Sequence, residues 1–309
     1  MHLPGELLSA IGKTPIVRLN RLPKGDSAEV WLKLEGTNPT GSMKDRMALS
    51  MIEGAERNGQ LHAGDRVVEM TGGSTGSSLA MVCAVKRYPA YFVTSDAIAA
   101  EKIRTMRAYG ATVEIVPSPD GKSSPALSAQ MLARVTHLAQ EPGTYWPKQF
   151  ENPDNPAGYH AMAAEIADRF ADKLDAFVMA IGTGGCFSGN AVILKERVPR
   201  IRCVAVEPAA SRNLSGGPLG AHRIEGTGVG FIPKIARMDL VDEIQSISDE
   251  EAIATTRRLA TEEGILVGVS SGANVAAALE VASHMTPGQR VVTVGVDTGL
   301  KYLAGATFL

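Results

Sequence analysis

Strand-like and helix-like segments alternate along almost the whole chain, and this alternation restricts the fold more than any other feature of the sequence. Short runs rich in β-branched and aromatic residues stand between longer stretches whose apolar residues recur every three or four positions. Met43, Met47, Met51 and Ala55, for example, mark one buried face of a helix. The predicted strands cover 29–36, 65–71, 90–95, 112–117, 144–147, 175–181, 200–208 and 290–297. The predicted helices cover 42–59, a stretch from about 75, 99–109, 124–139, 157–171, a stretch from about 187, 248–263 and 272–285.

Alternation of this kind is typical of parallel sheets that are covered by helices on both faces. Some ten strands in 309 residues indicate two sheets rather than one, so we predict an α/β fold with two domains. The stretch 209–235 is the one long segment without clear periodicity. Loops of that length inside a compact domain are usually functional or disordered, and its apolar and glycine content favours a function.

Composition and charge exclude several classes of protein. The formal net charge is −2, so no basic surface indicates nucleic-acid binding. No apolar run reaches the ~18 residues of a membrane span, and the N-terminus lacks the pattern of a secretory signal. The three cysteines (Cys83, Cys186 and Cys203) and the six histidines form no metal-ligand spacing. We therefore expect a cytoplasmic protein with reduced thiols and no metal.

The stretch GTNPTGSMKD (36–45) is close to a phosphate-binding loop but departs from it. Gly36 and Gly41 have the spacing of G-x-x-x-x-G-K-[ST], yet the lysine arrives two positions late, at Lys44. A cation at the positive end of a helix is electrostatically misplaced. If Lys44 is partly buried there, its pKa falls, as a lysine that forms a Schiff base requires; the alternative is a solvated surface charge.

Three glycine-rich turns follow predicted strands or lie in the aperiodic stretch: TGGSTGS (71–77), GTGGCFSG (182–189) and GTGVGF (226–231). The second favours a phosphate, because its glycines let backbone N–H groups converge at the start of a helix. A plain tight turn is the alternative, and Glu207 keeps a dinucleotide site open. The first turn suits a carboxylate or phosphate, or is an ordinary Ser/Thr helix cap.

These motifs together resemble the cysteine synthase (O-acetylserine sulfhydrylase) and cystathionine β-synthase family. KLEGTNPTGSMKDR resembles its lysine motif, TGGSTG its substrate loop and GTGGCFSG its phosphate loop. SGGPLGAHRIEGTGVGFIP and EEGILVGVSSGANVAAAL resemble later signatures. The match runs in order from about Thr14 to Tyr302. The resemblance implies fold type II of the pyridoxal 5′-phosphate (PLP) enzymes, the fold of the tryptophan synthase β-chain, with two mostly parallel sheets.

The resemblance also implies roles for individual residues. Lys44 would hold PLP and act as the acid and base, and Ser270 would hydrogen-bond the pyridine nitrogen. Ser74 would contact the 3′-oxygen of the cofactor. The cofactor phosphate would be held by Gly182, Thr183, Gly184, Gly185 and Cys186. The substrate carboxylate would be held by Thr71, Gly72, Gly73, Thr75 and Gln149.

The implied reaction is β-replacement on a serine derivative through an aminoacrylate intermediate, forming L-cysteine from O-acetylserine and a nucleophile such as sulfide. A serine at the pyridine nitrogen limits carbanion storage in the cofactor and favours β-chemistry. Three positions depart from the family pattern: Gly72 replaces a serine, Ser74 an asparagine and Cys186 a threonine. These departures leave open β-elimination, as in a dehydratase or cysteine desulfhydrase, and another nucleophile.

The resemblance further implies a homodimer and a smaller mobile domain over 41–146, which closes on a larger PLP-binding domain formed by 1–40 and 147–309. Two readings from other classes remain at this point. A nucleotide-binding oxidoreductase would not depend on Lys44. A non-catalytic binding protein would have little use for Lys44, Gln149 and Ser270 together.

Overall fold

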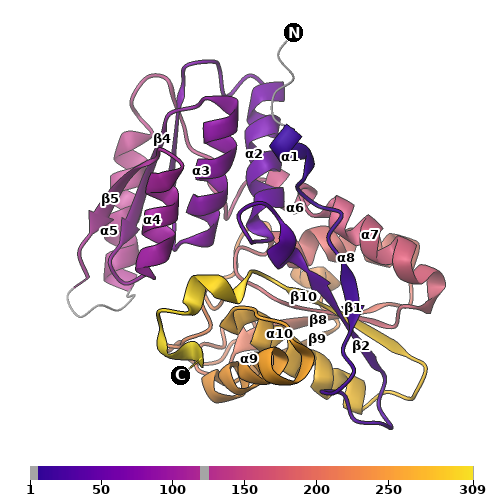
Figure 1. Ribbon diagram of the computed structural model, residues 1–309. Helices are drawn as coiled ribbons and strands as arrows, with labels where there is room; N and C mark the ends of the chain where they lie inside the picture. The colour runs from indigo at the N-terminus through magenta and orange to yellow at the C-terminus, as the bar shows by residue number, and fades with distance from the viewer. Residues whose placement is uncertain (1–5, 119–124, 309) are drawn as a thin grey trace.

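The computed structural model describes residues 6–118 and 125–308, which form two lobes, each built on its own sheet (Figure 1). All strands of the smaller sheet lie within 41–146, and all strands of the larger sheet lie outside that range. Residues 1–5, 119–124 and 309 of the predicted domain ranges, and the first residue of the helix predicted over 124–139, lie outside the described residues. No helix in the described part of the chain is long and apolar enough to cross a membrane.

The larger lobe contains a six-stranded sheet in the order β1-β2-β10-β7-β8-β9. Its strands are β1 (Ile16–Arg18), β2 (Glu29–Leu34), β7 (Ala176–Ala180), β8 (Arg202–Pro208), β9 (Glu243–Ile247) and β10 (Arg290–Gly295). Only β1 runs antiparallel to its neighbour within this sheet. Its helices are α6 (Asp154–Ala157), α7 (His160–Phe170), α8 (Gly185–Arg197), α9 (Asp249–Glu263) and α10 (Val269–Ser283).

The central strands of this sheet are buried on both faces, as expected for parallel strands. In β7, Phe177 and Met179 pack with residues of α7 and α8, whereas Val178 and Ala180 pack with α9 and α10. Figure 1 shows these two pairs of helices on opposite sides of the sheet. All five residues of β7 are buried, which explains why its sequence is an unbroken apolar run.

The smaller lobe contains a parallel sheet in the order β5-β4-β3-β6, with α5 on one face and α2, α3 and α4 on the other side of the lobe (Figure 1). Its strands are β3 (Arg66–Met70), β4 (Ala90–Ser95), β5 (Thr112–Val116) and β6 (Thr144–Tyr145). Its helices are α2 (Lys44–Arg57), α3 (Ser74–Lys86), α4 (Ala100–Ala108) and α5 (Pro125–Leu138), and α1 (Glu6–Ser9) packs against α3. The four residues predicted to form the buried face of α2 are all buried.

The predicted strands and helices are confirmed, with small shifts at their ends. The helix predicted over 157–171 is α7, and the short α6 precedes it; the helix predicted over 272–285 begins three residues earlier, at Val269. The stretch 209–235 contains no helix or strand, as predicted. Two strands were not predicted, β1 and β9. Both are edge strands, largely half-buried, so neither has the continuous apolar run by which central strands are detected.

Candidate active site

The segment that precedes Lys44 is tied to the chain that follows β10. Residues 41–43 lie against 296–298, and the Met43 N–H donates to Val296 O at 2.9 Å. Since β10 lies in the middle of the larger sheet, this pairing places the start of α2 beyond the carboxyl end of a central strand. Open parallel sheets bind their ligands at that edge.

Lys44 begins α2 and is half-buried. Its side-chain amine forms no ion pair or hydrogen bond with any residue that the structure describes. Burial lowers the pKa of Lys44, while the nearby Cys186 and Asp297 act in the opposite direction. An amine that is easily deprotonated and not committed to a protein carboxylate can condense with an aldehyde.

The turn 182–185 joins β7 to α8 and has no room for a side chain at its three glycines. A Cβ atom at Gly182 would overlap the carbonyl oxygen of Gly226, and one at Gly185 would overlap the Asn155 side chain. Gly184, the N-cap of α8, has φ 87°, a conformation that favours glycine. The first N–H groups of a helix have no intrahelical partner, so this turn presents backbone donors to an anion.

Two side chains connect this turn to the turn at 71–75. Asn155 Nδ2 donates to Thr183 Oγ1 at 3.2 Å and to the backbone oxygen of Gln149 at 2.6 Å. Thr75 Oγ1 in turn donates to Gln149 Oε1 at 2.8 Å. Although 108 positions separate Thr75 from Thr183 (183 − 75), the structure brings them into one chain of contacts.

The start of α3 is capped by Thr71, which lies two positions before the N-cap residue Gly73. Thr71 Oγ1 accepts the N–H groups of Gly73 and Gly76 at 3.1 and 2.9 Å. The cap predicted as the alternative function of this turn is therefore present, and it is made by Thr71. Ser74 is half-buried and Gly72 is exposed, so both remain accessible to a ligand.

A salt bridge joins the two lobes beside this turn. Lys102, on α4, is only 4% exposed and pairs with Glu225, in the loop that follows β8. Its aliphatic stem lies where a Cβ atom of Gly73 would be, and its amine lies 4.8 Å from the ring centroid of Tyr302. The smaller lobe thus contacts the larger lobe through a buried charge next to the predicted substrate turn.

Ser270 lies in the first turn of α10 and is buried. Its hydroxyl forms no side-chain hydrogen bond with the described residues and is free to donate to a ligand. The next residue, Ser271, accepts the N–H of Val296 at 2.9 Å, which attaches the start of α10 to the chain after β10. Ser270 and Lys44 therefore both belong to elements that are fastened at Val296, because its carbonyl oxygen also accepts the N–H of Met43.

Cys186 is buried in the first turn of α8, and burial raises the pKa of its thiol to about 12. Burial raises the pKa of Cys83 and Cys203 to about 12 as well, and all three cysteines are free. Thiols with such a pKa are neutral at physiological pH and poor nucleophiles. Cys186 therefore suits a structural position in the loop better than a catalytic one.

Glu207, which kept a dinucleotide site open, is engaged within the protein. It is buried and accepts the N–H of Leu214 at 2.8 Å and the hydroxyl of Ser215 at 2.5 Å. These contacts hold the start of the aperiodic stretch, so the carboxylate is not available to a ribose. The dinucleotide hypothesis was wrong.

The sequence did not single out Asn155, Asp297 or Glu69 as site residues. Asn155 supports both turns, and Asp297 is buried, accepts the Tyr302 hydroxyl at 2.7 Å and leaves its Oδ1 without a partner among the described residues. Asp297 lies at the end of a strand, which is the only signal that could have indicated it. Glu69 stands two positions before Thr71, at the end of β3.

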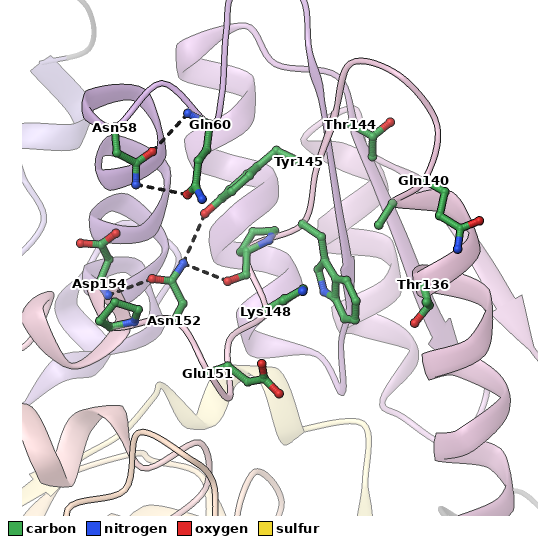
Figure 2. A pocket seen from close by; sticks show the side chains of 14 residues that line it. Asn58, Gln60, Thr136, Gln140, Thr144, Tyr145, Lys148, Glu151, Asn152 and Asp154 are labelled. Carbon is green, nitrogen blue, oxygen red and sulfur yellow. Dashed lines mark hydrogen bonds between the residues drawn. The ribbon is translucent and has the colours of Figure 1, made fainter.

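A surface hollow lies outside this site. It has a volume of about 670 Å³ and lies between the ends of α2 and α5 and the segment 144–154. Figure 2 shows Tyr145, Lys148 and Asn152 on one wall, with Thr136 on α5 and Gln140 just after that helix across from them. None of the predicted site residues lines it, but Lys148 directly precedes Gln149.

Replacing Gly182 with alanine is expected to weaken PLP binding about tenfold or more. The new methyl group would meet the backbone oxygen of Gly226, which cannot yield as a flexible side chain does. Gly25→Ala is the matched control, since a Cβ atom there has no neighbour within 4 Å. Titration of the protein with PLP, followed by absorbance, gives both affinities, and equal affinities for the two variants would contradict the prediction.

Together, the glycine cradle at the start of α8 fits a phosphate group, and the free Lys44 amine fits an aldehyde. Two parallel-sheet lobes with these features define a PLP enzyme of fold type II. The model of the family "Pyridoxal-phosphate dependent enzyme" matches residues 7–297, and the chain belongs to this family.

The chain is similar to several proteins whose names describe the synthesis of amino acids. The chain is 47% identical over 298 residues to a protein named probable cysteine synthase from Bacillus subtilis (strain 168), covering 95% of this chain and 94% of that protein. The structure of O-ureido-L-serine synthase is similar, with a TM-score of 0.92, 38% identity, and coverage of 98% and 94%. The O-acetylserine dependent cystathionine β-synthase from Helicobacter pylori has a TM-score of 0.91, 38% identity and full coverage of both chains.

Proposed function

We propose that this PLP-dependent enzyme catalyses β-replacement on O-acetyl-L-serine, with sulfide as the nucleophile and L-cysteine as the product. The observation that carries the proposal is the desolvated Lys44 amine, which has no carboxylate partner in the described structure and lies near Cys186, at the helix start that follows the glycine turn. The 47% identity to a protein named probable cysteine synthase supports this substrate pair. The β-replacement reading also agrees with the names of the two similar structures, since each names a serine derivative or a product built from one.

Each predicted residue has a task in this proposal. Bound PLP supplies the electron withdrawal that permits loss of the β-substituent and addition of a nucleophile. Lys44 holds the cofactor and then carries the proton that leaves and returns at the α-carbon. Ser270 offers a neutral donor to the pyridine nitrogen, and Ser74 offers a hydroxyl to the 3′-oxygen. The phosphate is held by Gly182, Thr183, Gly184, Gly185 and Cys186, and the substrate carboxylate by Thr71, Gly72, Gly73, Thr75 and Gln149.

A different nucleophile is the second candidate. Similar structures include an O-acetylserine dependent cystathionine β-synthase and an O-ureido-L-serine synthase, so this fold serves other acceptors at comparable similarity. The departures at Gly72, Ser74 and Cys186 lie in the cofactor and substrate loops and do not select one nucleophile. Competition between sulfide, homocysteine and hydroxyurea for the same loaded enzyme separates these candidates by product.

The smaller domain over 41–146 is proposed to close on the larger one when substrate binds, and closure would exclude water from the reacting groups. The Lys102–Glu225 salt bridge supports this proposal, because it joins the lobes next to the substrate turn. A homodimer and a cytoplasmic location are kept as proposals from the family resemblance. Light scattering after gel filtration tests the dimer.

The proposed function is tested by recording the visible spectrum of the PLP-loaded protein during titration with O-acetyl-L-serine. Binding and loss of acetate should change the cofactor band, and added sulfide should restore the band and yield L-cysteine. A spectrum that ignores O-acetyl-L-serine would refute this substrate. If the changed band instead returns while pyruvate and ammonia are released, with or without sulfide, the reaction is β-elimination.

Restoring a serine at position 72 is expected to tighten substrate binding. Gly72 is exposed and a Cβ atom there has no neighbour within 4 Å, so Gly72→Ser adds a hydroxyl without a clash. One added hydrogen bond to the substrate carboxylate should lower KM for O-acetyl-L-serine about two- to tenfold. Gly72→Ala is the control because it adds the carbon without the donor. Equal KM values for the two variants would argue against a carboxylate at this turn.

A further inference from the structure

Glu69 is a buried acid that lies just before the proposed substrate turn. It lies on β3, two positions before Thr71, and is 2% exposed. Its Oε1 accepts the N–H of Met70 at 2.9 Å and the indole N–H of Trp146 at 3.0 Å. Its Oε2 accepts the N–H of Gln149 at 3.3 Å. The carboxylate thus fastens the segment 146–149 to the end of β3.

The side chain of Gln149 contacts the turn at 71–75 and the residue before it. Its Nε2 donates to Met70 O at 3.0 Å, and its Oε1 accepts the Thr75 hydroxyl at 2.8 Å. Lys148, just before it, has φ 53°, a conformation that residues other than glycine rarely adopt. A backbone held in that conformation needs fixed partners on either side, and Glu69 accepts from both Trp146 and Gln149.

All of these partners are N–H donors, which determines the charge state that fits. An ionised carboxylate only accepts, so it satisfies Met70, Trp146 and Gln149 together, whereas a protonated acid brings an O–H that none of them can accept. No cation forms an ion pair with Glu69 among the described residues. Glu69 helps to raise the pKa of the Tyr145 hydroxyl, and the Lys148 ammonium lies 5.1 Å from the ring centroid of Trp146, whose indole N–H donates to Glu69. Burial outweighs the N–H donors and raises the pKa of Glu69 to about 7.

Trp146 also forms part of the outer wall behind this contact. It lines the hollow of Figure 2 together with Lys148 and Glu151, which are labelled there. Trp146 thus links the lining of the hollow to the Glu69 carboxylate, because its indole N–H donates to Glu69 Oε1.

We propose that Glu69 is a positioning residue for the substrate carboxylate: in its ionised form it holds Gln149 where the Gln149 side chain supports the turn at 71–75. This inference rests on the proposed function, because it takes that turn to be the substrate site. Glu69 touches neither cofactor nor substrate. Loss of Glu69 should therefore weaken the binding of O-acetyl-L-serine and leave the rate of the chemical step nearly unchanged.

Glu69→Gln in the full-length PLP-loaded enzyme tests the proposal, because the amide keeps the size of the acid but turns an NH₂ group toward N–H donors. We expect KM for O-acetyl-L-serine, and the concentration that half-changes the cofactor band, to rise about tenfold, with kcat within about twofold. In the unmodified enzyme KM should rise as pH falls below about 7, whereas in the variant it should stay at its raised value across this range. Glu114→Gln, a carboxylate on β5 of the same sheet bonded to Tyr91 and Arg134, is the matched control.

A KM in Glu69→Gln equal to that of the unmodified enzyme, or the same rise in Glu114→Gln, would overturn the inference. If Glu69→Gln does not fold, Trp146→Phe removes one donor and keeps the acid. It should raise KM about threefold, and an unchanged KM would then count against the proposal.

Hydrogen exchange over 144–150 gives a readout that does not need a substrate. Exchange in this segment should be faster in Glu69→Gln than in Glu114→Gln. If the unmodified enzyme ignores O-acetyl-L-serine, the proposed function fails while this measurement still decides on Glu69. Unaltered exchange in a folded Glu69→Gln would overturn the positioning role.

Discussion

Replacing Lys44 with alanine should reduce kcat/KM for β-replacement by at least about 10³-fold and remove the visible band of the lysine-bound cofactor. In the proposed mechanism the Lys44 amine holds PLP and carries the α-proton, so the variant lacks both the cofactor link and the proton carrier. The fold should survive, because the amine contributes no ion pair to the described structure and burial disfavours its charge. The midpoint of thermal unfolding without PLP should therefore change by no more than a few degrees.

The measurements for this prediction are the absorbance spectrum with PLP, turnover with O-acetyl-L-serine and sulfide, and thermal unfolding. Lys24→Ala removes an exposed lysine at another loop and serves as the control for altered charge. A Lys44→Ala protein that keeps both the cofactor band and turnover would remove the basis of the proposed mechanism. Turnover recovered by adding a small primary amine would support the role of Lys44 as the proton carrier.

Replacing the buried Arg46 with methionine should lower the free energy of unfolding by about 3–5 kcal/mol, because it breaks a buried ion-pair network. Arg46, two positions after Lys44, pairs with Glu35 through two contacts of 2.8 and 2.9 Å and with Glu165 through two of 2.9 Å. The Glu35 and Arg46 side chains are 0% and 3% exposed. Without Arg46 the Glu35 carboxylate is buried with no cation bonded to it directly, and Lys33, which bonds to Glu165, only partly compensates.

Thermal unfolding measures this loss, which should lower the midpoint by about 10 °C for a chain of this size. Arg258→Met is the control, since Arg258 pairs with Glu262 on the exposed side of α9 and should cost no more than about 0.5 kcal/mol. Similar midpoints for both variants would show that the buried network contributes little. Because Arg46 lies in the first turn of α2, the start of this helix should also shift in Arg46→Met. The PLP affinity of the variant should therefore fall together with its stability.

The pH dependence of this network has a definite sign. Arg46 and Lys33 lower the pKa of Glu165 to about 2, against an ordinary value of 4.5. A lowered folded-state pKa gives stability that is fully present above 4.5 and is lost as pH falls through the range from 4.5 to about 2. Arg46→Met should flatten this acid limb of the unfolding curve.

Much of the fold followed from local pattern. β7 and β10 are nearly unbroken apolar runs because both faces of the sheet are covered, and α2 shows its buried face as a repeat of every fourth residue. β1 and β9 escaped prediction because edge strands keep one side in solvent and mix polar with apolar residues. The start of α10 shifted by three residues, and its N-cap Gly268 forms no side-chain cap that a sequence pattern could reveal.

The candidate site divides in the same way. Lys44 and the turn at 182–185 could be predicted, because a lysine at a helix start and a glycine-rich turn after a buried strand carry their chemistry in a few adjacent residues. Asn155 and Asp297 could not, because an asparagine in a loop and an aspartate after a strand have many ordinary roles. Their importance depends on what lies opposite them, Thr183 and Gln149 in one case and Tyr302 in the other.

The sequence by itself determined the two mostly parallel sheets, the order of the motifs and the lysine of the proposed chemistry, since each is encoded in periodicity or in a short run of neighbouring residues. Only the tertiary structure decided which groups meet. Segment 41–43 pairs with 296–298, Lys102 reaches Glu225 between the lobes, and Glu69 fastens Gln149. The physical reason is that such contacts join residues 80 to more than 250 positions apart, and their partners become defined only when packing brings the strand ends together.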